Sequence, residues 1–294
     1  MHKSTLIGTL AILIWSTLAI FTIGAGNIPP FLLLAISFSV AFILGILWMW
    51  RAGNRAWRSL RQPWYVWIIS VSGLFGYHLF YFLALRHAPA VEANLINYLW
   101  PLLIVLLSAL LPGEKLRWYH GAGAFLGFAG AGLLVAKGSV AWDSAHLLGY
   151  IYAFLCAITW SSYSVTSRLF GKVPTSAVGG FCGAVMVLSW GVHFGFEASY
   201  VPTSTELISA ILLGLGPVGG AFYVWDVGMK HGDIRLLGTL AYAAPLLSTL
   251  LLIVLGFAKG SPSVWIACGL IIGGSLLSSA NYWKRGRKKA LNLS

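Results

Sequence analysis

Seven polar side chains lie in two apolar stretches of the chain, residues 76–86 and 94–101. On the first stretch Tyr77 and Tyr81 are four residues apart and His78 precedes Tyr81 by three, so a helix would place all three on one broad face. A hydroxyl or imidazole in hydrocarbon is costly unless it has a hydrogen-bond partner or faces water. We therefore expect these side chains to border a cavity inside a bundle of membrane helices.

The second stretch carries a similar polar stripe made of Asn94, Asn97, Tyr98 and Trp100. Pro101 follows within the same predicted helix. Because proline has no N–H, it leaves the carbonyl of Asn97 without its helical hydrogen bond. Such a break is tolerated at membrane depth only where protein or a cavity covers it.

Trp160 and Tyr163, on a later apolar stretch, complete the predicted site. An aromatic wall of this kind would hold a flat or bulky neutral solute, with hydroxyl, amide and imidazole groups at its polar end. The alternative is an aromatic belt at the membrane surface, to which we assign Trp64, Trp67, Trp118 and Trp283. The predicted substrate-binding residues are Tyr77, His78, Tyr81, Asn97, Tyr98, Trp100, Trp160 and Tyr163.

The composition is that of an integral membrane protein. The 294 residues are 59% hydrophobic and 9% charged, whereas soluble domains carry about 25% charged residues. Uncharged stretches long enough to span a bilayer, which takes about 20 residues, recur along the sequence, and the Gly/Pro-rich segment 24–30 divides the first of them. We predict an all-α fold of ten spans at residues 5–23, 30–50, 64–85, 91–111, 119–136, 148–169, 177–196, 207–228, 236–257 and 264–283.

The 19 lysines and arginines give a formal net charge of +12, and their distribution indicates orientation rather than a nucleic-acid partner. With the N-terminus inside, every basic residue except Arg86, Lys137 and Lys259 falls in a cytoplasmic segment. This positive-inside bias predicts that both termini are cytoplasmic. We interpret the arginines of residues 51–61 as anchors at anionic lipid headgroups.

The two halves of the chain are similar to each other. A shift of 145 residues places Trp15 and Ser16 on Trp160 and Ser161. A shift of 144 residues places Gly76 on Gly220, His87 on His231, Tyr98 on Tyr242, Pro101 on Pro245 and Gly130 on Gly274. Chance similarity between Leu/Gly/Ala-rich segments is the alternative, but matched Trp, Ser, His, Tyr and Pro favour a repeat.

Five spans per half is an odd number, so the halves must enter the membrane in opposite directions. Inverted repeats place a binding site at their interface, with alternating access. We predict a first five-helix repeat at 1–140, an inverted second repeat at 146–284 and a basic cytoplasmic tail at 285–294. Helix bending is expected at glycines 73, 76, 216, 219 and 220 and at prolines 101, 217 and 245.

Other kinds of functional site find no support in the sequence. Cys156, Cys182 and Cys268 lie within predicted spans, so no disulfide framework is expected. The sequence contains no phosphate loop, His-Glu-x-x-His or Cys-x-x-Cys motif, and its few acidic residues are too peripheral for paired-carboxylate catalysis. We expect no enzyme activity, cofactor, metal or nucleic-acid partner. The expected partners are a small-molecule substrate and membrane lipid, and we interpret the chain as a monomer.

Two small-residue motifs predict close helix packing. Gly123 and Gly127 in the fifth span, and Gly269 and Gly273 in the tenth, have the Gly-x-x-x-Gly spacing that lets helix backbones approach. We expect these motifs to pack the two spans together. A contact between two copies of the chain is the alternative.

Several motifs resemble those of a known family. The Trp-Ser pairs, residues 84–94 leading to Pro101, and Gly-Glu-Lys at 113–115 resemble EamA-type members of the drug/metabolite transporter superfamily over nearly the whole chain. Residues 76–85 with 97–101 are more particularly similar to bacterial YddG-type aromatic amino acid exporters. The resemblance implies a secondary transporter that exports aromatic and other neutral amino acids across the inner membrane. It also implies a cavity lined by Tyr77, His78, Tyr81, Tyr98, Trp100 and Trp160.

Three other functions are weighed against this interpretation. The same fold could export another small metabolite or drug. An intramembrane enzyme would need a nucleophile, an acid–base pair or a metal cluster at cavity depth, and the sequence offers none. A pore would conduct without a closed, occluded state. For His78 a substrate contact is the main interpretation, and proton coupling is the alternative.

Overall fold

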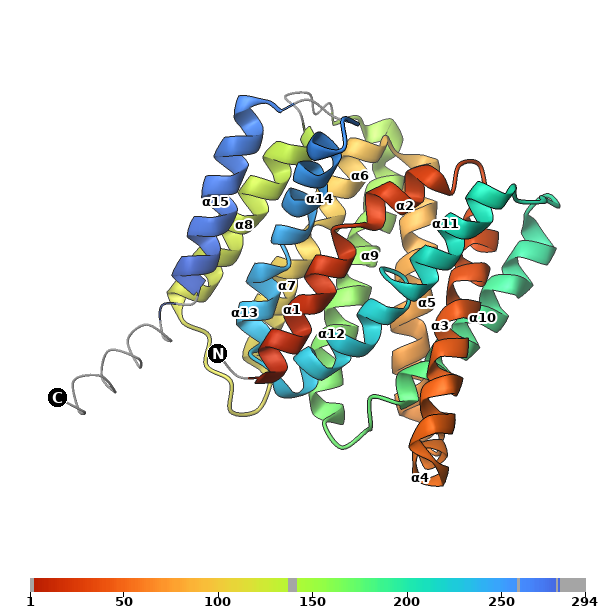
Figure 1. Cartoon of the computed structure of the whole chain (residues 1–294). Coiled ribbons are helices and arrows are strands. Elements are labelled where there is room, and N and C mark those ends of the chain that lie inside the picture. Colours follow the sequence, from red (N-terminus) through yellow and green to blue (C-terminus); the bar gives the residue numbers. More distant parts are fainter. Residues whose placement is uncertain (1–2, 137–141, 258–259, 279, 281–294) are drawn as a thin grey trace.

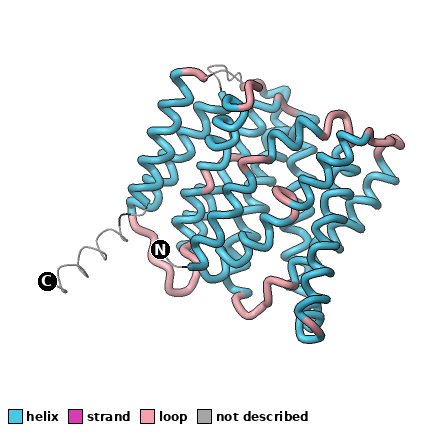
Figure 2. Tube along the Cα trace, in the orientation of Figure 1, coloured by secondary structure: helices cyan, strands magenta, loops and turns pink. Residues whose placement is uncertain are grey.

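The computed structural model describes residues 3–136, 142–257, 260–278 and 280, and these consist of helices joined by loops, without strands (Figures 1 and 2). The predicted tail 285–294 lies outside the described residues. The helices of the first half are α1 (Lys3–Trp15), α2 (Leu18–Gly24), α3 (Pro30–Ala52), α4 (Asn54–Trp57), α5 (Trp64–His87), α6 (Ala90–Asn97), α7 (Leu99–Leu107) and α8 (Trp118–Ala136). Those of the second half are α9 (Leu147–Ser167), α10 (Ala177–Phe196), α11 (Ser204–Leu215), α12 (Gly220–His231), α13 (Ile234–Leu240), α14 (Ala243–Val254) and α15 (Pro262–Ser278), with the short 3-10 helix η4 (Arg168–Phe170) after α9.

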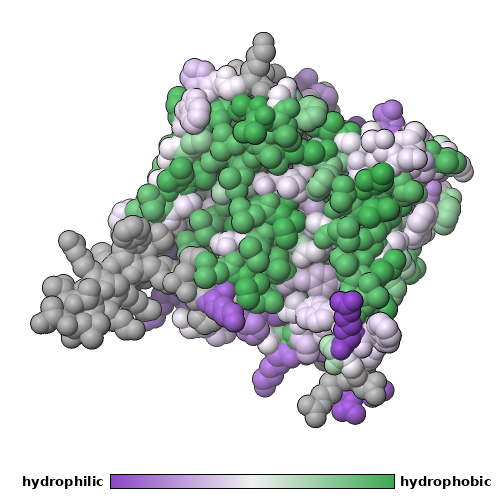
Figure 3. All heavy atoms as spheres, in the orientation of Figure 1, coloured by the Kyte–Doolittle hydropathy of each residue, from purple (hydrophilic) through white to green (hydrophobic). Residues whose placement is uncertain are grey.

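Eight segments of the described chain are long and apolar enough to cross a membrane. They are α1–α2, α3, α5, α6–α7, α9 with its flanking turns, α10, α11–α12 and α13–α14. Their side chains form an apolar band between more polar ends (Figure 3). A multi-pass, all-α membrane protein is thereby confirmed, and the total of ten spans stays a prediction. We call the end where α1 begins and α4 lies the lower end, as oriented in Figure 1.

The helices pack in four close pairs. α5 packs on α9, α1 on α12, α3 on α10, and α8 on α15, which lie together at one edge of the molecule (Figure 1). Glycines bring some of these backbones close together. A Cβ added to Gly8 would lie 2.9 Å from the Cα of Gly228, and one added to Gly45 would lie 2.5 Å from the Cα of Gly179. The largest buried apolar cluster joins residues of α1, α3, α5, α7, α9, α10, α12 and α13.

The predicted packing of two Gly-x-x-x-Gly motifs is half right. Gly123 on α8 faces the backbone of Gly274 on α15, and Gly127 faces the ring of Tyr242. Gly269 and Gly273, in contrast, face open space. α15 therefore presents a different face to α8 from the predicted one, and its contact glycine is Gly274.

Two buried carboxylates tie loops together at the upper end. Glu197 accepts hydrogen bonds from the N–H groups of Phe31 and Leu32, 2.9 and 3.1 Å away, at the N-terminus of α3, where a negative charge is favourable. Glu206 accepts one from the N–H of Asn27 at 3.1 Å. His193 is buried beside Glu197, with its Nδ1 2.9 Å from Glu197 Oε2.

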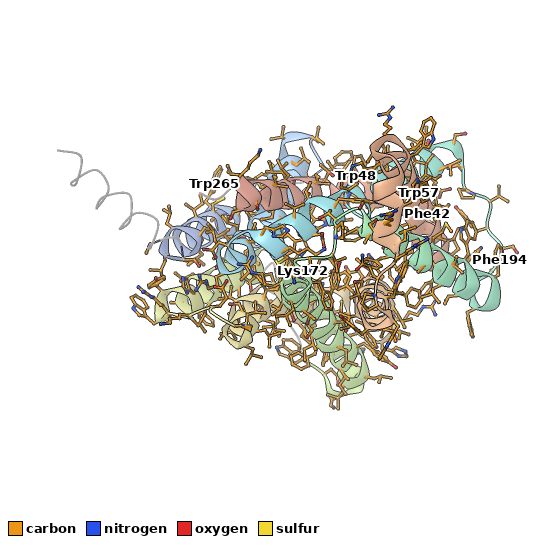
Figure 4. The ribbon with its side chains drawn as sticks, turned by 90° about the horizontal axis from the view of Figure 1, so that it is seen from below. Phe42, Trp48, Trp57, Lys172, Phe194 and Trp265 are labelled. Atoms are coloured by element: carbon orange, nitrogen blue, oxygen red, sulfur yellow. The ribbon has the colours of Figure 1, made fainter. Side chains whose placement is uncertain are left out.

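Aromatic residues also lie near the surface at both ends. Seen from the lower end in Figure 4, Trp48 and Trp57 lie on the side of the molecule formed by α3 and α4, and both are partly exposed. Phe194 lies at the outer edge of the molecule on α10 and is exposed. These positions agree with an aromatic belt at the membrane surface.

Candidate functional site

Four of the candidate spans are interrupted midway along their length. α1 ends at Trp15 and α2 begins at Leu18, Tyr98 separates α6 from α7, and residues 241–242 separate α13 from α14. The fourth break is the segment 216–219 between α11 and α12. Three breaks coincide with predicted bending points at Pro101, Pro217 and Pro245, where proline withholds an N–H from the helix.

Gly73 and Gly76, also predicted as bending points, do not interrupt a helix, because α5 runs unbroken from Trp64 to His87. Gly73 instead gives space to a neighbouring side chain. A Cβ at this position would lie 2.5 Å from the Cβ and ring of Tyr163 on α9. Its role is therefore close packing between α5 and α9.

The four breaks surround a cavity of about 260 Å³. This volume lies just below the range of about 300–1,000 Å³ found for drug-sized ligands, so the cavity suits a single small solute. Among the described residues that form its wall there is no acidic side chain, lysine or arginine. The lining residues are Trp15, Leu18, Thr22, Leu33, Leu34, Ser37, Tyr77, His78, Tyr81, Phe82, Asn94, Asn97, Tyr98, Trp100, Trp160, Leu213, Pro217, Val218, Phe222, Ala241, Ala244 and Pro245.

Four tryptophans form a cluster at the lower boundary of the cavity. Trp15 of α1 packs against Trp225 of α12, Trp160 of α9 and Trp100 of α7, with ring centroids 5.0, 5.9 and 6.0 Å apart. The indole N–H of Trp15 donates to the carbonyl of Pro217 at 3.0 Å, which fixes the ring beside the break in α11–α12. In the described chain the lining residues lie at this level and above it, up to the exposed Thr22. The cavity is therefore closed towards the lower end.

Two hydrogen bonds join α5 to α6 along one side of the cavity. Tyr81 donates its hydroxyl to Asn94 Oδ1 at 2.9 Å, and Asn97 Nδ2 donates to the hydroxyl of Tyr77 at 3.3 Å. The rings of Tyr77 and Tyr81 are nearly parallel, with an interplanar angle of 4°. These bonds give partners to the hydroxyls of Tyr77 and Tyr81, and they hold the two tyrosine rings as one face of the cavity.

The hydrogen bond of His78 fixes the chemistry of its ring. Nδ1 lies 2.7 Å from the carbonyl oxygen of Leu74, and because a carbonyl only accepts, Nδ1 must carry a proton. The ring packs among Phe38, Phe222 and Tyr77. In the neutral imidazole, Nε2 then has a lone pair and acts as a hydrogen-bond acceptor at the cavity wall.

Seven of the eight predicted binding residues line this one cavity; Tyr163 lies outside the lining. Its buried ring packs against Trp160 and against Gly73 of α5. Trp15, Ser37 and Phe222 also line the cavity, although sequence reasoning did not place them in the site. For Trp15 the signal was present, because it is the repeat mate of Trp160.

Asp226 and Lys230 of α12 form an ion pair, with Nζ 2.8 Å from the carboxylate. Both side chains are buried, and neither lines the cavity. Within the described residues there is no group of three metal-ligating side chains.

Comparisons with known proteins identify the family of the chain. A model of the "EamA-like transporter family" matches residues 2–136. A curated relative, "Aromatic amino acid exporter YddG" of Ancylobacter novellus, is 52% identical over 94% of this chain and 97% of its own length. The chain belongs to the EamA-like transporter family.

Other relatives extend this result. The Escherichia coli protein of the same name is 29% identical over 94% of this chain and 96% of its own. A solved crystal structure with 52% sequence identity superimposes with a TM-score of 0.91, covering 95% of this chain and 96% of that one. Membership of the EamA-like family makes the chain a membrane transporter and not an enzyme, as the sequence motifs indicated.

Proposed function

We propose that the protein exports aromatic and other neutral amino acids from the cytoplasm across the bacterial inner membrane by alternating access. The observation that carries this proposal is the uncharged, aromatic cavity at the junction of four broken helices. Relatives named aromatic amino acid exporters support the same substrate class. The indoles of Trp100 and Trp160 would stack on the substrate side chain.

The polar end of an amino acid is a zwitterion, which needs donors for its carboxylate and acceptors for its ammonium group. His78 Nε2 supplies an acceptor, so we assign the ammonium group to this side of the cavity. A tyrosine hydroxyl can donate, and that of Tyr98, which lines the cavity, suits the carboxylate. Because the described wall has no acidic side chain, lysine or arginine, solutes with a net charge should bind poorly.

The proposed topology has ten spans, with α8 and α15 as the fifth and tenth and both termini in the cytoplasm. Basic residues near the helix ends support this orientation. Arg51, Arg61, Lys115, Lys172 and Arg235 all lie at the lower end, which the positive-inside rule assigns to the cytoplasm. The cavity would then be open to the outside and closed to the cytoplasm.

The proposed inverted repeat is supported by matched helix contacts. Under the shift of 144 residues α1 corresponds to α9 and α12 to α5, and the packing of α1 on α12 has its counterpart in the packing of α9 on α5. The breaks at Tyr98 and Tyr242 also correspond. These two residues meet, because the Tyr242 hydroxyl donates to the Tyr98 carbonyl at 3.1 Å. Such symmetry is the usual basis of alternating access.

The test is uptake by purified protein in liposomes preloaded with unlabelled phenylalanine, with labelled phenylalanine outside. We expect saturable exchange that tryptophan and neutral aliphatic amino acids inhibit and that lysine and glutamate do not. Trp160→Ala should abolish most of the exchange while the protein still inserts in the membrane. No exchange of any amino acid, or inhibition only by a drug or another metabolite, would contradict the proposal and favour an exporter of the same fold for that solute.

A further inference from the structure

A network of charged side chains closes the lower end of the molecule, centred on Glu114 in the Gly-Glu-Lys turn. Oε1 of Glu114 lies 3.1 Å from Nη2 of Arg168, and Oε2 lies 3.1 Å from Nη2 of Arg235. Each carboxylate oxygen therefore serves one arginine. The three side chains are only 16–25% exposed, so solvent screens them less than a surface pair.

The two arginines also hold backbone groups of both halves. Arg168 Nη1 donates to the carbonyls of Met229, Lys230 and Gly232 at 3.1, 3.0 and 2.7 Å, which places a cation at the C-terminus of α12. Arg235 Nη1 donates to the carbonyl of Lys115 at 2.6 Å. The turn of the first half is thereby attached to three second-half elements: η4, the end of α12 and the start of α13.

The buried pair of Asp226 and Lys230 strengthens the second-half side of this contact. Lys230 Nζ donates to the carbonyl of Val173 at 3.0 Å, and Thr175 Oγ1 donates to Asp226 Oδ2 at 2.6 Å. These bonds hold α12 against the loop that follows η4. We therefore expect α12, η4 and the loop after η4 to move as a unit, to which Glu114 of the first half is bound through Arg168 and Arg235.

The network lies below the tryptophan cluster, on the path that a solute from the cytoplasm would take. The cluster comes from α1, α7, α9 and α12, and the network binds the segments that follow the last three of these helices. Lys172, just after η4, lies near the centre of the lower end in Figure 4. Opening this end requires the helices to separate, which would break both contacts of Glu114.

The upper end has no corresponding charge at the matched position. A shift of 144 residues aligns Arg235 with Val91, a neutral side chain at the start of α6. The ion pair between Glu114 and Arg235 therefore has no counterpart at the position that the repeat matches to Arg235.

We propose that Glu114, with Arg168 and Arg235, is a latch that holds the cytoplasmic end closed and sets how often the carrier opens there. The proposal rests on the proposed function, because it is measured through amino acid transport. Two partly exposed ion pairs predict an effect of about 2- to 30-fold on the ratio of inward-open to outward-open protein.

The test compares labelled phenylalanine uptake in right-side-out and inverted membrane vesicles, which present the outer and the cytoplasmic face. Glu114→Gln should lower the half-saturating concentration at the cytoplasmic face relative to the outer face by about 2- to 30-fold. Arg235→Gln should shift it in the same direction by less. The double variant should shift it no further than Glu114→Gln alone, because the shared contact is already lost.

Arg58→Gln is the matched control, since it removes an exposed arginine of the same face outside the network and should leave the ratio unchanged. An unchanged ratio in both Glu114→Gln and Arg235→Gln, with wild-type transport intact, would overturn the latch. Equal shifts in Arg58→Gln would also overturn it, because the effect would then follow net charge. Wild-type vesicles that carry no amino acid would instead overturn the proposed function, and the latch with it.

Discussion

Among single residues, His78 has the most closely defined role, because its bond to Leu74 leaves one ring nitrogen as an acceptor. His78→Phe keeps a flat ring and removes that acceptor. Loss of a hydrogen bond to a charged group costs about 1.5–3 kcal/mol, so phenylalanine flux at low concentration should fall about 10- to 150-fold. His78→Gln restores an acceptor and should recover much of the flux. Initial rates in liposomes measure both.

Tyr163→Phe is the control for this prediction. The Tyr163 hydroxyl lies outside the cavity lining, although sequence reasoning placed it in the site. Its removal should leave the rate within about twofold, as for most changes away from special features. A loss as large as that of His78→Phe would move the binding site away from the cavity described here.

The contrast between these residues explains what the sequence could reveal. Tyr77, His78 and Asn97 were predictable because lipid excludes unpaired polar groups, so their position required a cavity or a partner. Phe222 carries no polar atom, and an apolar ring looks the same in sequence whether it packs in a core or lines a cavity. The prediction for Tyr163 was wrong although its side chain is polar. Its ring packs against Gly73 on another helix instead of facing the cavity, and the sequence does not show that contact.

At the scale of helices, Tyr242 stabilises the break between α6 and α7. Its hydroxyl donates to the Tyr98 carbonyl and accepts from the Leu102 N–H, both at 3.1 Å. Tyr242→Phe leaves two backbone groups unpaired at a fully buried site. The expected loss of stability is about 1–3 kcal/mol, measured as a lower midpoint of thermal unfolding in detergent.

Tyr119→Phe is the matched control, since it makes the same chemical change on α8. The Tyr119 hydroxyl is buried and has no hydrogen-bond partner among the described residues. Its removal relieves an unpaired polar group and should leave the unfolding midpoint unchanged or slightly higher. Equal losses in the two variants would mean that the Tyr242 bridge contributes nothing specific.

The contact between α8 and α15 gives a second prediction at this scale. A Cβ on Gly123 would lie 2.5 Å from the carbonyl oxygen of Gly274, which is backbone and cannot move aside easily. Gly123→Ala should therefore lower the unfolding midpoint by the equivalent of about 1–3 kcal/mol. Gly269 faces open space, so Gly269→Ala should leave stability unchanged or raise it slightly, because alanine favours helix. A larger loss of stability in Gly269→Ala than in Gly123→Ala would instead support the packing predicted from sequence, in which Gly269 and Gly273 lie at the contact.

The helix breaks were only partly readable from the sequence. Proline marks a loss of an N–H donor, so the breaks near Pro101, Pro217 and Pro245 follow from local chemistry. The break at residues 16–17 has no proline or glycine, but the hydroxyls of Ser16 and Thr17 donate to the carbonyls of Leu13 and Ile14. A Ser-Thr pair is a local signal for such a break, whereas the contact of Trp15 with Pro217 on another helix leaves no signal in the local pattern.

For the whole molecule, charge and periodicity predict a symmetric transporter, but they do not predict which end is closed. The tryptophan cluster lies at the lower boundary of the cavity and the Glu114 network lies below it, and both depend on contacts between residues more than 50 positions apart. Opposite insertion of the two halves is a separate claim, because it concerns topology alone. His87 and His231, which the repeat aligns, are exposed at opposite ends of the molecule and can test it.

Single substitutions His87→Cys and His231→Cys should be labelled from opposite faces of the membrane. A membrane-impermeant maleimide applied to intact cells should modify the cysteine at position 87, since α5 ends at the outer face. The cysteine at position 231 should react only after the inner membrane is opened. The wild-type protein measures the background from the native cysteines, of which Cys156 and Cys182 are buried and Cys268 is partly exposed. Labelling of both positions from the same face would mean that the halves insert in parallel, and alternating access through inverted repeats would lose its structural basis.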